Sequence, residues 1–119
     1  MVVEGTVTEG RRLGRELGFP TANIPVPDDF PAEDGVYEAW AETDDGARYR
    51  AMSNLGRNPS VGTTERRLET HLFGFDGTLY GRVLRVELGC RIRGERVFAS
   101  LGELRAQIER DKRTILNLR

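Results

Sequence analysis

A period-two pattern between residues 84 and 92 constrains the fold of this chain more than any other feature. Leu84, Val86, Leu88, Cys90 and Ile92 alternate with residues that are mostly arginine or glutamate. Successive side chains of a β-strand point to opposite faces, so the pattern predicts a strand that is buried on one face and exposed on the other. A half-buried strand needs partner strands and a core, which the rest of the chain must supply.

Shorter segments supply candidate partner strands. Residues 2–8 are rich in β-forming residues, and residues 21–24 predict a brief strand before a proline-rich connection. Residues 35–41 and 48–52 flank an Asp-Asp-Gly turn at 44–46, which is a strong hairpin signal. These segments provide four of the expected strands.

The second half of the chain adds another strand, a loop and a helix. Residues 68–73 alternate as a strand does, with Leu68, Thr70 and Leu72 on one face and Glu69, His71 and Phe73 on the other. Residues 54–64 are polar and contain Gly56, Pro59 and Gly62, which predicts a long loop. Ser100 and Glu103 match a capping box at a helix start. One face of the expected helix carries Leu101, Leu104 and Ile108.

The expected fold is therefore mainly β. Five or six strands joined mostly by hairpin-like turns, followed by one helix, predict a small antiparallel barrel with a C-terminal α-helix packed outside it. At 119 residues the chain is expected to form a single domain, residues 1–119. We find no internal repeat and no linker.

Charge and cysteine content exclude several functional classes. The 18 basic and 19 acidic residues give a net charge of −1, so no global field draws the chain to nucleic acid or membrane, and anion recognition must be local. A single cysteine and a single histidine are too few to complete a zinc site. The lone cysteine also fits a reducing compartment. With no long apolar run and no signal-peptide pattern, we expect a cytoplasmic protein.

The segment GRRLGRELGFPTAN, residues 10–23, is the first candidate for chemistry. Its glycines, beginning with Gly10, and its arginines, including Arg15, can form an anion-binding loop, but spacing alone favours a solvated surface turn. Thr21 and Asn23 are expected to point the same way and offer neutral oxygen ligands for a Mg²⁺ that arrives with nucleotide phosphates. On spacing alone, local hydrogen bonding that fixes the chain between the prolines is the better explanation of these two residues.

Further candidates lie in the second half of the chain. Glu69 is either a general base for a hydroxyl nucleophile or one half of a strand-face pair with His71 or Arg67. The cluster of Arg91, Arg93 and Arg96 beside Phe98 either holds a flat heterocycle or marks a solvated strand end. Residue types and spacing leave these alternatives open.

Taken together, the motifs resemble the riboflavin kinase family, whose members are free-standing kinases or the C-terminal kinase domains of bifunctional bacterial FAD synthetases. The motifs follow one another in order along nearly the whole chain. They are the Gly5-Thr-Val7 start, the Pro20-Thr-Ala-Asn23 segment, Gly35-Val-Tyr37, Asn54-Leu-Gly-Arg-Asn-Pro59, Leu68-Glu-Thr-His-Leu72, Leu79-Tyr-Gly81, Ile92-Arg-Gly-Glu95, Phe98-Ala-Ser-Leu101 and Gln107-Ile with Asp111.

The resemblance implies a six-stranded antiparallel Greek-key-like barrel with a C-terminal helix. The implied reaction transfers the γ-phosphoryl group of ATP to the 5′-hydroxyl of riboflavin, giving FMN, with Mg²⁺ as the metal. The implied residue roles are Glu69 as general base; Thr21 and Asn23 for Mg²⁺; Gly10, Arg15, Thr21, Asn23, Leu72 and Tyr80 for ATP; and Arg93, Arg96 and Phe98 for the flavin.

Riboflavin and ATP are thus the expected small-molecule partners, without nucleic acid or membrane. We expect either a monomer or part of a longer bifunctional chain, and FMN formation without FAD synthesis. The alternative is a non-catalytic flavin- or nucleotide-binding module with the same barrel. It rests on positions that differ from the family's usual residues: Leu13, Gly94 and residues 114–119.

Overall fold

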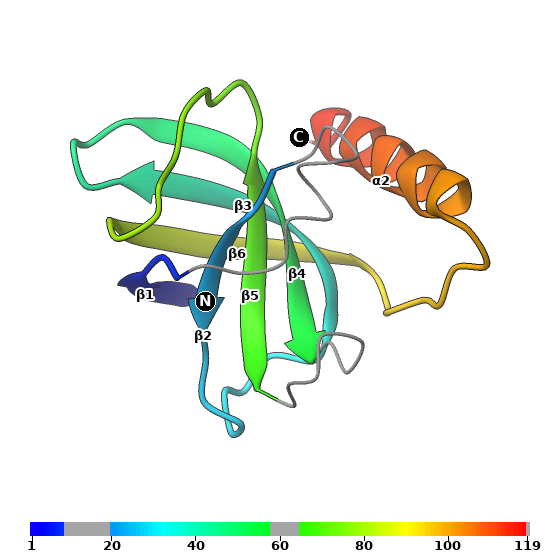
Figure 1. Ribbon diagram of the computed structural model, residues 1–119, viewed down its shortest axis with the longest axis horizontal. Helices are drawn as coiled ribbons and strands as arrows, with labels where there is room; N and C mark the ends of the chain where they lie inside the picture. Colours follow the sequence, from blue (N-terminus) through cyan, green and yellow to red (C-terminus); the bar gives the residue numbers. More distant parts are fainter. Residues whose placement is uncertain (9–19, 58–64, 119) are drawn as a thin grey trace.

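The computed structural model describes residues 1–8, 20–57 and 65–118, and these residues form six strands and one helix (Figure 1). All strand pairs are antiparallel, and the order across the sheet is β1-β6-β3-β4-β5-β2. The elements are β1 (Val2–Thr6), β2 (Ala22–Pro25), β3 (Gly35–Thr43), β4 (Arg48–Arg57), β5 (Arg66–Leu72), β6 (Val83–Arg93) and α2 (Leu101–Leu116).

The sheet curls into a nearly closed barrel because its two edge strands meet. Just after β1, the amide of Thr8 donates a hydrogen bond of 2.8 Å to the carbonyl of Asn23 in β2. The hydroxyl of Thr8 donates to the same oxygen at 3.3 Å. The predicted six-stranded antiparallel barrel with a C-terminal helix is confirmed, and its seam lies at Asn23.

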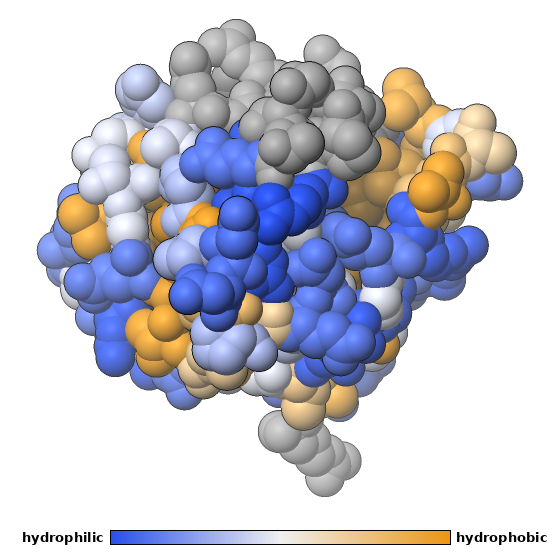
Figure 2. All heavy atoms as spheres, turned by 90° about the horizontal axis from the view of Figure 1, so that it is seen from below, coloured by the Kyte–Doolittle hydropathy of each residue, from blue (hydrophilic) through white to orange (hydrophobic). Residues whose placement is uncertain are grey.

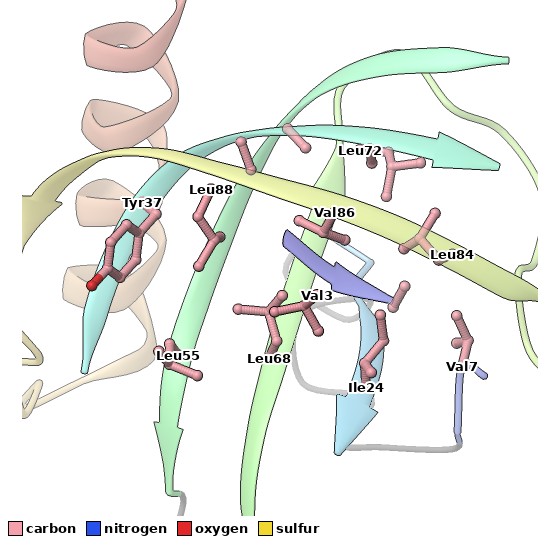
Figure 3. Close-up of a cluster of buried hydrophobic side chains, with 14 of the residues drawn as sticks. Val3, Val7, Ile24, Tyr37, Leu55, Leu68, Leu72, Leu84, Val86 and Leu88 are labelled. Atoms are coloured by element: carbon pink, nitrogen blue, oxygen red, sulfur yellow. The ribbon is translucent and has the colours of Figure 1, made fainter. Parts of the chain in front are cut away.

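The core fills the inside of the barrel, and alternation along the strands puts it there. Leu84, Val86 and Leu88 of β6 point inward, as their period-two pattern predicts. Ile24 and Leu68 reach the same core from β2 and β5 (Figure 3). Each fully buried side chain of this size contributes about 1.5–3 kcal/mol of hydrophobic stabilisation.

The predicted alternation in β6 is wrong beyond Leu88, because a bulge interrupts the strand. Gly89 and Cys90 together oppose Glu38 of β3, where the register shifts. The Glu38 side chain occupies the space above Gly89, so a Cβ there would lie 2.6 Å from its Cγ, and Glu38 accepts a 3.1 Å hydrogen bond from the Cys90 amide. This bond lowers the pKa of Glu38. Cys90 is consequently exposed, and Ile92 packs outside the barrel.

The loop predicted over residues 54–64 is wrong in its first part. Residues 54–57 continue β4 and pair with β5, with Asn54 opposite Glu69. The polar Asn54 and the small Gly56 obscure the strand pattern, although the inward-facing Leu55 between them is fully buried. The remaining residues, 58–64, lie outside the described part of the chain.

The helix begins where the capping box predicts. The hydroxyl of Ser100 accepts from the Glu103 amide at 3.1 Å, and Glu103 in turn accepts from the Ala99 amide. The expected apolar face is partly wrong, because Leu101 is exposed. The buried helix residues are instead Gln107, Asp111 and Ile115.

Helix α2 packs on the outside of the barrel, where Ile115 meets Val36 and Met52 in a second, smaller apolar cluster. Seen from below, most of the described surface is hydrophilic, with apolar residues scattered over it (Figure 2). No helix in the described part of the chain has the length and hydrophobicity needed to span a membrane.

Candidate active site

Several candidate site residues lie in one row of cross-strand neighbours on the outer face of the barrel. Asn23 of β2 lies opposite Glu69 of β5, which lies opposite Asn54 of β4. The row continues through Val36 of β3 to Arg93 of β6. Directly opposed residues have Cβ atoms about 4.5–5.5 Å apart and share a face. The row therefore places one carboxylate between two carboxamides, with a cation at its far end.

Asn23 carries an unsatisfied polar atom at the first position of this row. The residue is buried, with an exposed fraction of 3%, and its Oδ1 has no hydrogen-bond partner in the part of the chain that the structure describes. Buried polar atoms nearly always have a partner, so an orphan of this kind needs an explanation. A carboxamide oxygen is a hard, neutral donor of the sort that Mg²⁺ accepts.

His71 fixes the backbone that leads into β2. Its Nδ1 lies 2.8 Å from the carbonyl oxygen of Pro20. Since a carbonyl only accepts, Nδ1 carries the proton of this hydrogen bond. Burial lowers the pKa of His71, and the charge of Lys112 acts in the same direction against the bond to Pro20. A neutral imidazole thus anchors the chain just before Thr21, which is half-buried.

Arg93, Arg96 and Phe98 form a second cluster, where β6 leads toward α2. The guanidinium of Arg93 binds the Asp111 carboxylate through Nε and Nη2 at 2.9–3.1 Å. Arg96 donates to the side chain of Gln107 at 2.6 Å. Both guanidinium carbons lie near the Phe98 ring, at 5.9 and 5.2 Å from its centroid. The structure therefore brings together the three residues that the sequence predicts for the flavin.

Two of the residues expected to contact ATP occupy very different environments. The side chain of Leu72 belongs to the barrel core (Figure 3). Tyr80 is 61% exposed in the turn before β6 and is accessible for stacking. Gly10 and Arg15 lie outside the described residues. The ligand roles of all four residues stay predictions.

Comparison with known proteins decides the family. Residues 1–118 match the sequence profile of the Flavokinase family, described as riboflavin kinase. The chain belongs to the riboflavin kinase family. It is 37% identical over 110 residues to the bifunctional riboflavin kinase/FMN adenylyltransferase of Haemophilus influenzae and 40% identical over 112 residues to that of Escherichia coli. These alignments cover 92% and 94% of this chain but only 36% of each relative.

The chain is also similar to a further curated relative and to two solved structures. The RNA-binding riboflavin kinase RibR of Bacillus subtilis is 39% identical over 111 residues, which cover 92% of this chain and 47% of that protein. A solved structure described as a macrolide-efflux protein from Streptococcus pneumoniae superposes with a TM-score of 0.86 at 33% identity, over 99% of this chain and 39% of that one. Riboflavin kinase from Trypanosoma brucei shares the fold, with a TM-score of 0.71 at 24% identity over 98% of this chain and 77% of that one.

Within this candidate site, the structure shows neighbouring residues whose positions and contacts the sequence did not predict. Asn54 is the outer-face neighbour of Glu69, a position hidden in the sequence by the loop-like composition of residues 54–64. Gln107 and Asp111 hold Arg96 and Arg93, and the Gln107 amide donates to Asp111 at 2.9 Å. Their spacing of four residues beside Ile108 was the available signal, because it puts polar groups on the packed face of the helix.

Proposed function

We propose that this chain is a riboflavin kinase domain that transfers the γ-phosphoryl group of ATP to the 5′-hydroxyl of riboflavin and releases FMN and ADP. Membership of the family supports the reaction class. The observation that carries the residue roles is the pairing of Asn23 with Glu69 across β2 and β5. It sets an orphaned oxygen ligand directly beside a carboxylate, as a metal-assisted transfer to a hydroxyl requires. The chain spans about a third of its bifunctional relatives, so the proposal concerns the kinase activity alone.

Asn23 and Thr21 are the proposed Mg²⁺ ligands. The unsatisfied Oδ1 of Asn23 fits a cation, and the hydroxyl of Thr21 lies two residues earlier on the segment that His71 anchors. Two neutral ligands bind free Mg²⁺ weakly but suit an ion that is already held by ATP phosphates. When bound, Mg²⁺ would neutralise charge on the transferring phosphoryl group.

Glu69 is the proposed general base. Its carboxylate accepts the proton of the riboflavin 5′-hydroxyl while that oxygen forms the new bond to the γ-phosphorus and the bond to ADP breaks. Phosphoryl transfer depends mainly on positioning and charge neutralisation, because its loose transition state requires little deprotonation before attack. A half-buried carboxylate on β5, a strand that is paired on both sides at this residue, meets the positioning requirement.

The remaining contacts follow from the two clusters. Arg93, Arg96 and Phe98 would hold the isoalloxazine ring, since guanidinium groups and phenyl rings both stack on flat heterocycles. Gly10, Arg15, Leu72 and Tyr80 are the proposed nucleotide contacts beyond Thr21 and Asn23. The arrangement would place the flavin on the side of α2 and the nucleotide on the side of β2.

The Glu69→Gln variant tests the proposal. It keeps the size and hydrogen-bonding capacity of the side chain but cannot accept the proton, so we expect FMN formation to fall by about 10²–10⁴-fold. The dissociation constants for riboflavin and Mg-ATP, measured by fluorescence titration and calorimetry, should change by no more than a few fold.

Glu87→Gln serves as the matched control, because Glu87 is an exposed carboxylate on β6 that pairs with Arg48. It should turn over as the unmodified chain does. Normal turnover by Glu69→Gln would refute the base assignment. Flavin binding without FMN formation by the unmodified chain would favour a non-catalytic module.

A further inference from the structure

Asn54 occupies the point between the proposed base and the flavin cluster. On one side, it lies directly opposite Glu69 in the β4–β5 register. On the other side, residues that follow β6 reach back to β4, where the carboxylate of Glu95 fills the space that a side chain at Gly56 would take. Gly56 is two residues from Asn54 on the same face of the strand, so about 7 Å separates these positions.

The contact of Glu95 with Gly56 places the segment after β6 against β4. Glu95 as a whole is exposed, but its carboxylate end lies against Gly56, and this partial burial, together with the nearby charge of Asp34, raises its pKa. Arg96 and Phe98 follow Glu95 by one and three residues. Along the row, Asn54 lies between Glu69 and Arg93, and the guanidinium of Arg93 lies beside the Phe98 ring. A ligand that extends along the row from Phe98 to Glu69 therefore passes Asn54.

The side chain of Asn54 is suited to a ligand at this point. The residue is exposed, and its carboxamide forms no hydrogen bond with another described residue. A carboxamide both donates and accepts, which matches a hydroxyl group that does the same. The neighbouring Val36 is covered by α2, so Asn54 is the polar group of the row that remains accessible between Glu69 and the helix.

Riboflavin carries such hydroxyls between its ring and its reactive end. Its ring is joined to the 5′-hydroxyl through a polyol chain with further hydroxyl groups along it. If the ring lies at Phe98 and the 5′-hydroxyl at Glu69, the secondary hydroxyls of the polyol lie over Asn54. We propose that Asn54 binds these secondary hydroxyls and thereby selects flavins with a polyol side chain. This inference rests on the proposed function and adds the group that recognises the polyol.

The test compares two flavins on the unmodified chain and on Asn54→Leu. Riboflavin is the first, and the second is an analogue whose side chain is a 5-hydroxypentyl group, which keeps the reactive hydroxyl but lacks the secondary ones. Loss of two hydrogen bonds should lower kcat/KM for riboflavin at least tenfold in Asn54→Leu. The variant should phosphorylate the hydroxypentyl flavin as well as the unmodified chain does, and its KM for ATP should not change.

Two further variants keep the result interpretable. Asn54→Gln retains the carboxamide and should recover part of the preference for riboflavin. Asn117→Leu removes an exposed carboxamide at the end of α2, where only the backbone amide caps the helix, and should leave both flavins unaffected.

Equal losses on both flavins, or no loss on riboflavin, would overturn the role of Asn54. Equilibrium binding of the same two flavins, followed by flavin fluorescence, gives the same comparison without turnover. An unmodified chain that makes no FMN but binds riboflavin through Asn54 would therefore refute the kinase proposal and leave this inference standing.

Discussion

Three buried polar side chains on the adjacent strands β4, β5 and β2 differ in their hydrogen bonding. The hydroxyls of Ser53 and Thr70 lie inside the barrel and bond to each other at 2.7 Å. The Oδ1 of Asn23 is equally buried but has no partner among the described residues. An unsatisfied buried group costs about 1–3 kcal/mol, so folding alone does not favour the asparagine. The metal-binding role proposed for Asn23 would account for it.

This contrast predicts opposite outcomes for two substitutions. Asn23→Ala removes an oxygen that has no partner, so it should change the melting temperature little while raising the KM for Mg-ATP at least tenfold. Ser53→Ala strands the Thr70 hydroxyl and should lower stability by about 1–3 kcal/mol with the kinetic constants intact. Thermal melts and steady-state kinetics on the same preparations distinguish them. An Asn23→Ala variant as destabilised as Ser53→Ala would show that the carboxamide is structural.

At the scale of residues, motif resemblance located most of the candidate site, and register explained why its members act together. Thr21, Asn23, Glu69 and the residues around Phe98 follow from short motifs in the sequence. The position of Asn54 beside Glu69 does not, because cross-strand register depends on the pairing of segments that no local pattern specifies. Leu72, which the sequence predicts to contact ATP, has its side chain in the core, and its motif alone did not indicate this.

At the scale of elements, the flavin cluster is supported by the contact between the end of β6 and α2. This joint consists of the Arg93–Asp111 and Arg96–Gln107 contacts. Arg93 is anchored by a bidentate bond to Asp111, whose side chain is only 4% exposed. Gln107 bridges the two arginines by accepting from Arg96 and donating to Asp111. The helix thus contributes polar groups rather than leucines to this contact, which is why Leu101 is exposed.

Breaking this joint should affect stability and flavin binding together. Asp111→Asn removes the charge that compensates the partly buried Arg93, so we expect a loss of about 2 kcal/mol in the free energy of unfolding, less than for a fully buried pair. Riboflavin affinity should fall more than Mg-ATP affinity, because Arg93 and Phe98 lose their fixed orientation. Urea denaturation and two ligand titrations measure these effects.

The exposed pair of Arg105 and Glu109 on the same helix is the matched control. Glu109→Gln should cost less than about 0.5 kcal/mol, as is usual for surface pairs four residues apart on a helix. If the two variants were equally stable, the joint would not hold the helix in place. If Asp111→Asn weakened both ligands alike, its effect would be general rather than specific to the flavin side.

The strands show where local periodicity succeeds and where it fails. The inward residues of β6 up to Leu88 follow the pattern, and the bulge at Gly89 and Cys90 then reverses it. The cause is Glu38 on another strand, which no reading of β6 alone includes. In β4, residues 54–57 keep the alternation of a strand, but Gly56 makes the segment resemble a loop in the sequence. A glycine is needed there because Glu95 fills the space of a side chain.

At the scale of the whole molecule, one part of the outer face of the barrel packs against α2, and another part carries the proposed site residues. Helix α2 packs outside the barrel (Figure 1) and covers the part around Val36 and Met52. The row from Asn23 to Asn54 runs across β2, β5 and β4. The seam that closes the barrel, between Thr8 and Asn23, runs through a proposed metal ligand. Closing the fold and shaping the site therefore depend on the same residue.

The share of its relatives that the chain covers predicts the products of the 119-residue chain. The chain corresponds to 36% of relatives whose names carry both a kinase and an adenylyltransferase activity, and the family match of residues 1–118 is to the kinase alone. Incubated with riboflavin and Mg-ATP, it should accumulate FMN without FAD. Supplied with FMN and Mg-ATP, it should form no product. Chromatography with flavin fluorescence resolves the three flavins.

The bifunctional protein of Escherichia coli, added to a parallel reaction, should carry FMN on to FAD and so show that the conditions permit the second step. FAD formed by the 119-residue chain alone would contradict the prediction, and it would require a second nucleotide site. The described barrel leaves little room for one, because the inside is filled by the apolar core and α2 covers part of the outside. A chain that makes FMN, loses that activity in Glu69→Gln and never makes FAD would have its chemistry confined to the row between Asn23 and Asn54.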